Sequence, residues 1–341
     1  MADGTSIEVF TLTEGKIEAR IITYGGILVS LKVPDQTGEV DDVVLGFDTL
    51  EEYVEVFNSQ TNPFFGAIIG RYANRIARGR FTLAGKTYSV PVNNGRNSLH
   101  GGPHGFHNVI WSGKEIENGV ELGYLSKDGE AGYPGNLSVK VRYTLQQSAF
   151  TIEYLATTAQ LTVVNLSHHS YFNLCGQGRG DILNHELTLH ASRFAAVDFT
   201  LIPTGELRPV ASTPFDFREP RLIGERIDAN DQQLIFAKGY DHNWVLDSSG
   251  EDVTFAAEVH EPRSGRVLQV STTQPGVQFY SGNFLDGTVQ GKGGAKYVRR
   301  GGLCLETQHF PDSPNHPEFP STELRPGEHY YHRTVYRFSV L

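Results

Sequence analysis

Cysteine is scarce in this 341-residue chain, which contains only Cys175 and Cys304. Two cysteines cannot build a disulfide framework, so the composition favours a reducing compartment such as the cytoplasm. Neither cysteine has a C-x-x-C partner or an adjacent base in the sequence. We therefore expect both to be small buried hydrophobic residues rather than reactive thiols.

Basic residues are outnumbered and do not form runs. The chain has 29 lysines and arginines against 39 acidic residues, a formal net charge of -10, and no basic run longer than a pair. It offers no stripe to neutralise phosphates, which argues against nucleic acid or an anionic membrane as a partner. Long apolar runs are also missing, because no segment approaches the roughly 20 apolar residues of a membrane helix. The N-terminal sequence is polar and acidic, so we expect a soluble protein without a signal peptide.

Helical patterns are few, whereas strand patterns run throughout. Apolar and polar side chains alternate at 27–33, 137–145, 150–156, 253–259, 268–272 and 336–340. Turn dipeptides separate these runs, namely Asn118-Gly119, Asp128-Gly129, Ser264-Gly265 and Pro326-Gly327. The best helix candidate is Thr49–Phe57, with Asp48 as its N-cap and Glu51 three residues later.

Strand following strand without βαβ alternation predicts an all-β fold, a large antiparallel β-sandwich with few short helices. No linker-like composition, low-complexity stretch or fixed-period repeat interrupts residues 7–341. We therefore expect a single domain over residues 1–341.

Histidines invite a metal interpretation that the sequence supports only weakly. His100, His104 and His107 lie within one Gly- and Pro-rich segment that has no acidic or cysteine partner nearby. A loop lining a ligand site is favoured over a metal site, with a surface histidine in a flexible turn as the other alternative. His185 and His190 are one residue too far apart for a zinc-protease motif and lie in strand-like alternation. The chain also lacks a G-x-S-x-G elbow, so hydrolysis through an activated serine has no support.

Two segments place a histidine and a carboxylate in largely uncharged, aromatic-rich surroundings. Residues 165–174 contain His168 and His169, and residues 305–312 contain Glu306. A carboxylate beside a histidine can remove one proton and deliver another near neutral pH. The two segments thus predict acid-base catalysis.

Three further segments supply groups that suit a sugar. Asn74-Arg75 follows an apolar run, and Asp241 and Gln278 each lie close to aromatic residues. Amides, a carboxylate and a guanidinium can hydrogen-bond paired hydroxyls, while aromatic rings cover the C–H faces of a pyranose. This combination favours a neutral, oxygen-rich ligand.

Taken together, these segments resemble the aldose 1-epimerase family over nearly the whole chain. Six motifs occur in order: 66–79 with Asn74-Arg75, 97–102 with His100, 165–174, 239–243, 273–280, and Glu306-Thr-Gln-x-x-Pro-Asp. The resemblance implies an antiparallel β-supersandwich, in agreement with the strand pattern. It also implies acid-base interconversion of the α and β anomers of D-galactose and D-glucose, without a metal or a cofactor.

The resemblance implies Glu306 as the catalytic base and His169 as the acid. The residues that it places around the sugar are Asn74, Arg75, His100, Ser170, Tyr171, Asp241 and Gln278. One position departs from the family pattern, because Asn usually precedes the catalytic histidine and this chain has His168. The Ser-Tyr-Phe-Asn-Leu sequence that follows aligns His169 with the acid.

For Glu306 to be ionised while His169 is protonated, the pKa of His169 must stay near or above about 6.5, and we expect the carboxylate to keep it there. The pH–rate profile should then be bell-shaped.

Two alternative functions remain. A hexose-6-phosphate 1-epimerase would need two or three basic residues around the sugar, where only Arg75 is expected. A non-catalytic sugar-binding or sensor protein on the same fold should have lost Glu306 or His169. The expected partner is a free aldohexose, and the resemblance implies a monomer or weak homodimer.

Overall fold

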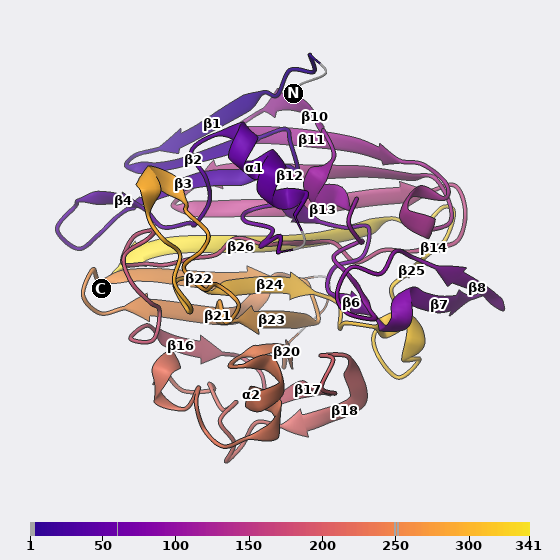
Figure 1. The fold of residues 1–341 in the computed structure, drawn as a ribbon. Coiled ribbons are helices and arrows are strands. Elements are labelled where there is room, and N and C mark those ends of the chain that lie inside the picture. Colours follow the sequence, from indigo (N-terminus) through magenta and orange to yellow (C-terminus); the bar gives the residue numbers. More distant parts are fainter. Residues whose placement is uncertain (1–3, 60, 249, 251) are drawn as a thin grey trace.

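The computed structural model describes residues 4–59, 61–248, 250 and 252–341, so residues 1–3, 60, 249 and 251 of the domain expected at 1–341 lie outside the described part (Figure 1). Its largest element is a nine-stranded antiparallel sheet. In spatial order its strands are β10 (Ser112–Ile116), β11 (Gly119–Ser126), β12 (Leu137–Gln146), β13 (Ala149–Thr158), β26 (Tyr330–Val340), β22 (Arg266–Thr272), β21 (Thr254–Glu261), β16 (Glu186–Leu189) and β19 (Arg221–Leu222).

Two smaller antiparallel sheets form the second layer (Figure 1). The four-stranded sheet has the order β1 (Val9–Glu14), β2 (Ile17–Ile22), β3 (Leu28–Pro34) and β4 (Val40–Asp42). The five-stranded sheet has the order β18 (Pro203–Pro209), β17 (Arg193–Val197), β20 (Asp241–Val245), β23 (Gly276–Tyr280) and β24 (Cys304–Gln308).

The core lies between the layers because the large sheet is apolar on one face only. In β12, Val139, Val141 and Tyr143 are buried while the intervening residues are more exposed, as the alternation predicts. Both smaller sheets touch this apolar face. The Tyr143 hydroxyl donates to the Gly26 carbonyl beyond β2, at 2.8 Å, and the Tyr336 hydroxyl of β26 donates to the Leu305 carbonyl of β24, at 3.3 Å. A single cluster of buried side chains accordingly runs through all three sheets.

Short pairs of strands and short helices complete the described part of the chain. The pairs are β5 (Ile68–Ile69) with β15 (Ser167–His168), β6 (Arg75–Ile76) with β9 (Ser98–Leu99), β7 (Arg80–Leu83) with β8 (Lys86–Ser89), and β14 (Thr162–Val163) with β25 (Glu323–Leu324). The α-helices are α1 (Leu50–Phe57) and α2 (Gln232–Ala237). The 3-10 helices are η1 (Ala77–Gly79), η2 (Phe106–Asn108), η3 (Glu130–Gly132), η4 (Ile223–Glu225), η5 (Lys292–Gly294) and η6 (Ser313–Asn315).

The all-β sandwich with few short helices is confirmed, and one local detail is wrong. The N-cap of α1 is Thr49 rather than Asp48, and Thr49 forms a capping box with Glu52. No helix in the described ranges combines the length and the apolar character needed to cross a bilayer.

Candidate active site

A cavity of about 530 Å³ lies over the five-stranded sheet, lined by residues of β20, β23 and β24 and by loops from several parts of the chain. Small-molecule sites typically have volumes of about 300–1,000 Å³. Seven of the nine predicted site residues line this cavity: Asn74, Arg75, His100, His169, Tyr171, Asp241 and Glu306. The sequence segments that carry them are far apart, so the fold brings them together.

Three neighbouring strands place the two carboxylates. Gln278 of β23 pairs with Glu306 of β24 on one side and with Asn243 of β20 on the other. Because strand side chains alternate, Asp241 shares a face with Asn243, and so Asp241, Gln278 and Glu306 lie on one face of the sheet. The intervening residues, such as Leu305, join the core between the layers.

The backbone of His169 is fixed on both sides. Its N–H donates to the Ala67 carbonyl at 3.0 Å, and its own carbonyl accepts from the Gly66 N–H at 2.9 Å. These bonds extend the pairing of β15 with β5. The imidazole ring packs against Phe64 and Tyr171, with centroids 5.8 Å and 5.2 Å away. The side chain therefore has little room to change its direction.

Asn165 joins the segment before His169 to the end of β24. Its side-chain oxygen accepts from the His309 N–H at 3.0 Å, and its amide nitrogen donates to the His309 carbonyl at 3.2 Å and to the Ala73 carbonyl at 3.4 Å. One buried amide thus links the chain around Asn74, the chain before His169 and the strand that carries Glu306.

His169 and Glu306 face each other in the cavity, with 3.7 Å between the histidine Nε2 and the glutamate Oε1. Both side chains are buried. Burial raises the pKa of Glu306 well above its ordinary value, and Asp241 adds to the rise while Arg75 opposes it. Burial lowers the pKa of His169 to about 4.

These shifts correct the expectation that Glu306 keeps the pKa of His169 near or above its ordinary value. Desolvation penalises each charged form, and it outweighs the attraction between the two groups. Between the lowered pKa of His169 and the raised pKa of Glu306 the pair holds one proton, either as carboxylic acid and neutral imidazole or as carboxylate and imidazolium. Such a pair can give one proton and take another.

Asn74 and His100 hold each other in strained backbone conformations. Their φ angles are 61° and 53°, in the left-handed region that non-glycine residues seldom adopt and that is enriched at functional sites. The Asn74 N–H donates to His100 Nδ1 at 3.1 Å. Because Nδ1 is then an acceptor, the ring proton is assigned to Nε2, and burial keeps the pKa of His100 well below its ordinary value. His100 is thus a neutral hydrogen-bond donor toward the cavity.

The polar end of the cavity combines a guanidinium with a carboxylate. Arg75 Nη2 lies 3.7 Å from Asp241 Oδ2, and Arg75 Nε donates to the Asn94 side chain at 3.1 Å. Gln278 donates from Nε2 to Asp241 Oδ1 at 2.7 Å. Gln278 therefore orients Asp241 from the neighbouring strand β23 and is not among the residues that line the cavity, in contrast to its expected place beside the sugar.

Ser170 also lies off the cavity. Its hydroxyl bonds His168 Nδ1 at 3.2 Å, and both side chains are buried. The ring of His168 packs edge-on against Tyr143 of the large sheet. The residue before His169 thus belongs to the core, and only His169 reaches the cavity.

The other two histidines of the Gly-rich segment have separate surroundings. His107 is buried and packs edge-on against Phe57 and Phe64, whereas His104 is exposed. His100 is buried in the cavity wall, so the alternative of a surface turn is wrong for it.

Several lining residues were missed by sequence reasoning. Tyr280 belongs to a recognised motif, and Asn94 precedes a glycine in a polar turn. Phe64 packs against both His100 and His169. Phe199 and Phe284 stand at the mouth, with 69% and 52% of their surface exposed. Nothing in the sequence around these last two residues signals a site, because they are isolated aromatics in loops.

A metal ion is the one alternative occupant that the donor set suggests. Ligand atoms of His100, His169 and Glu306 lie within 4.8 Å of one another, and no other such group occurs among the described residues. However, Arg75 lies close enough to lower the pKa of Glu306, so its charge would oppose a cation there. The absence of a required metal stays a prediction.

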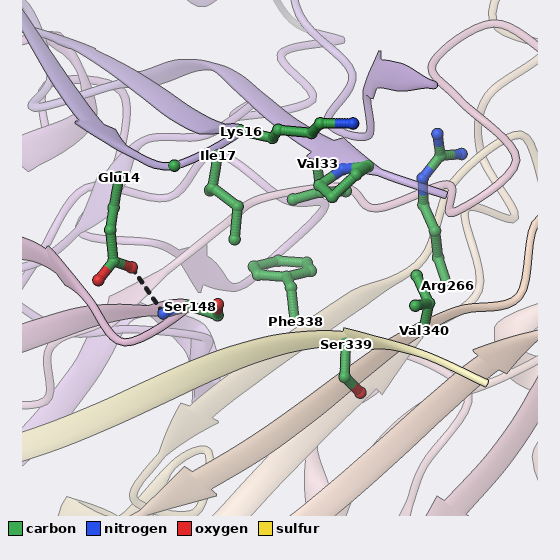
Figure 2. Close-up of a pocket in the computed structure, with 11 residues that line it drawn as sticks. Glu14, Lys16, Ile17, Val33, Ser148, Arg266, Phe338, Ser339 and Val340 are labelled. Carbon is green, nitrogen blue, oxygen red and sulfur yellow. Dashed lines mark hydrogen bonds between the residues drawn. The ribbon is translucent and has the colours of Figure 1, made fainter. Parts of the chain in front are cut away.

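A second cavity, of about 340 Å³, lies between the ends of the two layers (Figure 2). Ile17, Val33 and Phe338 form its apolar walls. The Glu14 carboxylate accepts a hydrogen bond from the Ser148 N–H at 2.7 Å and so stabilises the turn between β12 and β13. No histidine–carboxylate pair lies among the residues lining this cavity, which distinguishes it from the first one.

Comparison with known proteins gives one consistent result. A family model described as aldose 1-epimerase matches residues 8–337. A galactose mutarotase from Bos taurus is 50% identical over 335 residues, covering 98% of this chain and 95% of the relative, and one from Homo sapiens is 49% identical over 337 residues, covering 99% and 95%. A crystal structure of an aldose epimerase homologue from C. elegans superimposes with a TM-score of 0.88 at 30% identity, covering 98% of this chain and all of that one. The matched region includes every residue that lines the first cavity.

Proposed function

The chain belongs to the aldose 1-epimerase family and acts as an isomerase, and from this premise we propose that it interconverts the α and β anomers of D-galactose and D-glucose. The observation that carries the proposal is the buried contact of His169 with Glu306, 3.7 Å apart, in a cavity that also offers an amide, a guanidinium and a second carboxylate. A mutarotase needs one group that accepts a proton and one that donates a proton, both beside a sugar site.

In the proposed reaction Glu306 is the base and His169 is the acid. The Glu306 carboxylate takes the proton of the anomeric O1 hydroxyl, and the O1–H electron pair forms the C1=O1 double bond. The C1–O5 bond breaks with its electrons moving to O5, which receives the proton from His169 Nε2. After rotation about C1–C2, the reverse proton transfers close the ring as the other anomer. In this step His169 acts as the base and Glu306 as the acid.

The reacting form is the carboxylate–imidazolium pair. It differs from the neutral pair only by transfer of one proton between Glu306 and His169, so no proton from solvent is needed to reach it. Hydroxyls of a bound sugar can hydrogen-bond to both groups, and such bonds favour the charged forms.

The sugar is held by the remaining cavity residues. Asp241 and Arg75 can bind adjacent hydroxyls, because a carboxylate accepts and a guanidinium donates hydrogen bonds. Asn74 and the Nε2–H of His100 supply further polar contacts, and Tyr171 presents an aromatic surface to the C–H groups. Discrimination between galactose and glucose then depends on how these groups meet the C4 hydroxyl.

A phosphorylated hexose suits this cavity less well. Besides Arg75, the lining includes Arg96, but Arg96 lies 3.8 Å from Asp198 and stacks over Phe199 at the mouth. Asp241 and Asp286 line the same cavity and would repel a phosphate. The balance of charge therefore supports a neutral sugar.

Polarimetry of freshly dissolved α-D-galactose and α-D-glucose tests the proposal directly. We expect the purified protein to accelerate the approach to the equilibrium rotation, and Glu306→Gln to remove that acceleration. Acceleration restricted to hexose 6-phosphates would show that the protein is a hexose-6-phosphate 1-epimerase. A folded protein that accelerates neither class of sugar would contradict the proposal.

We further propose that the protein works as a monomer or weak homodimer on a free aldohexose in the cytoplasm. Both cysteines are unpaired, which suits a reducing compartment.

A further inference from the structure

Strand β24 offers two side chains to the catalytic histidine. Cys304 and Glu306 are two residues apart and therefore lie on the same face of the strand. Glu306 Oε1 is 3.7 Å from His169 Nε2, and Cys304 Sγ is 3.6 Å from His169 Nδ1. Each ring nitrogen thus faces a side chain of the same strand.

The thiol is a neutral partner at this position. Cys304 has no exposed surface. Burial raises the pKa of its thiol well above the ordinary value, and the carboxylates of Glu306 and Asp241 add to the rise. A protonated thiol is a weak hydrogen-bond acceptor through sulfur. It can accept from an imidazole N–H without bringing another charge into the site.

We propose that Cys304 is a positioning residue for His169: its sulfur accepts a hydrogen bond from Nδ1–H and so leaves Nε2 as the nitrogen that exchanges protons. This inference rests on the proposed acid role of His169. Which imidazole nitrogen carries the proton is set by the partner of the other nitrogen. With Nδ1 kept protonated, the Nε2–H bond breaks as O5–H forms, and the ring that remains is the neutral Nδ1–H tautomer. On reclosure Nε2 takes the same proton back.

The ring has one further hydrogen-bond partner within reach, the backbone of His169 itself. This bond raises the pKa of His169, against the larger lowering that burial causes. The ring of His100 stands edge-on at 5.0 Å and is kept neutral by burial. Besides Glu306 and Cys304 on β24, the charged groups that face the site are Asp241 on β20, Arg75 on β6, and Arg96 and Asp286 in loops.

Two substitutions of Cys304 separate a hydrogen bond from simple packing. Cys304→Ala removes the acceptor, and we expect kcat to fall about 10-fold, the scale on which outer partners of metal-bound histidines act, with KM within about 2-fold of wild type because Cys304 does not line the cavity. Cys304→Ser keeps an acceptor, and we expect it to recover most of kcat. If Cys304 only fills space, the order reverses, because serine buries a hydroxyl that alanine does not have. Cys175→Ala is the matched control, since Cys175 is half-buried beside Glu261 and should leave kcat unchanged.

NMR of ¹⁵N-histidine-labelled protein tests the proposal without using activity. The His169 signals are identified as those missing from His169→Asn. We expect Nδ1 of His169 to be protonated in the wild type at neutral pH, and this state to be lost or shared with Nε2 in Cys304→Ala. An unprotonated Nδ1 in the wild type would overturn the proposal, as would a Cys304→Ala variant with unchanged kcat and spectrum.

The two proposals can fail separately. Failure of the wild type to accelerate mutarotation would refute the function, while the NMR experiment would still decide the role of the thiol. If Cys304→Ala does not fold, the wild-type spectrum and the kcat of Cys304→Ser decide, and a Cys304→Ser variant at least 10-fold slower than wild type counts against the proposal.

Discussion

The imidazole rings of His168 and His169 lie on opposite sides of the chain although the two residues are consecutive. The ring of His169 meets Glu306 in the cavity, and the ring of His168 packs against Tyr143, with 5.8 Å between centroids. His168 replaces the asparagine that the family usually has there, so its place decides whether it takes part in the chemistry. The geometry assigns it to the core.

His168→Asn should therefore leave mutarotation within about 3-fold of wild type, whereas His169→Asn should lower kcat by about 10²- to 10⁴-fold, the usual worth of a positioned acid or base. Polarimetry with α-D-galactose gives both rates, and circular dichroism checks that each variant is folded. Equal losses in the two variants would mean that the rings act together.

Glu306→Gln should lower kcat by about 10²- to 10⁴-fold, equivalent to about 3–5 kcal/mol of barrier. The amide keeps the size of the side chain but cannot take the O1 proton. We expect KM to change much less than kcat, since the sugar is bound mainly by other residues. Glu186→Gln is a suitable control, because the half-buried Glu186 lies on β16 of the nine-stranded sheet, whereas Glu306 lies on β24 of the five-stranded sheet.

The stability of the protein should fall in acid. Burial lowers the pKa of His107, His168 and His242 to about 3 in the folded state, against about 6.5 when unfolded. Between these values the unfolded chain binds more protons, so the free energy of unfolding decreases as pH falls from about 6.5 toward 3. Each such histidine contributes up to about 1.4 kcal/mol per pH unit.

Urea unfolding at pH 7, 6 and 5 measures this slope. His168→Asn removes one of the titrating groups. Its free energy of unfolding should therefore fall less steeply with decreasing pH than that of the wild type, by about 1.4 kcal/mol per pH unit, which corresponds to one proton. A slope unchanged by His168→Asn would show that His168 titrates normally in the folded protein.

Asn165→Ala should lower the free energy of unfolding by about 1–3 kcal/mol, because it leaves the partly buried backbone groups of His309 without their partner. We also expect kcat to fall, since the same amide aligns the strand that carries Glu306 with the chain around Asn74. Asn108→Ala is a suitable comparison: its amide also bonds a carbonyl, that of Pro103, but near the surface. A loss of stability no larger than that of Asn108→Ala would argue against the link.

Treatment with EDTA followed by gel filtration should leave the rate of mutarotation unchanged, because each proposed proton transfer uses a side chain of the protein. Restoration of a lost activity by added Zn²⁺ would instead assign His100, His169 and Glu306 as metal ligands.

Much of the fold follows from the sequence because alternation is a local property. The pattern at 137–145 needs only its own side chains to show which face is buried, and β12 has that pattern. The start of α1 is harder, because Asp48 and Thr49 each have a glutamate three residues later. Both fit a capping box by spacing, and only the three-dimensional turn selects Thr49. The single-domain organisation stays a prediction.

The site is less accessible to sequence reasoning, since a motif does not show which side chains face the ligand. Ser170 lies beside His169 in the chain but bonds His168, and Gln278 supports Asp241 from outside the cavity. Phe199 and Phe284 reach the mouth from loops whose path depends on the whole fold. These assignments require coordinates.

Strand β24 carries Cys304 and Glu306 on one face and Leu305 and Thr307 on the other. A slip of one residue against β23 would exchange the faces, because strand side chains repeat every two residues. A leucine and a threonine would then stand where the thiol and the carboxylate meet His169, while the sheet kept most of its backbone hydrogen bonds. Mutarotation would therefore report the register of this edge strand, and could reveal a misaligned protein that circular dichroism would count as correctly folded.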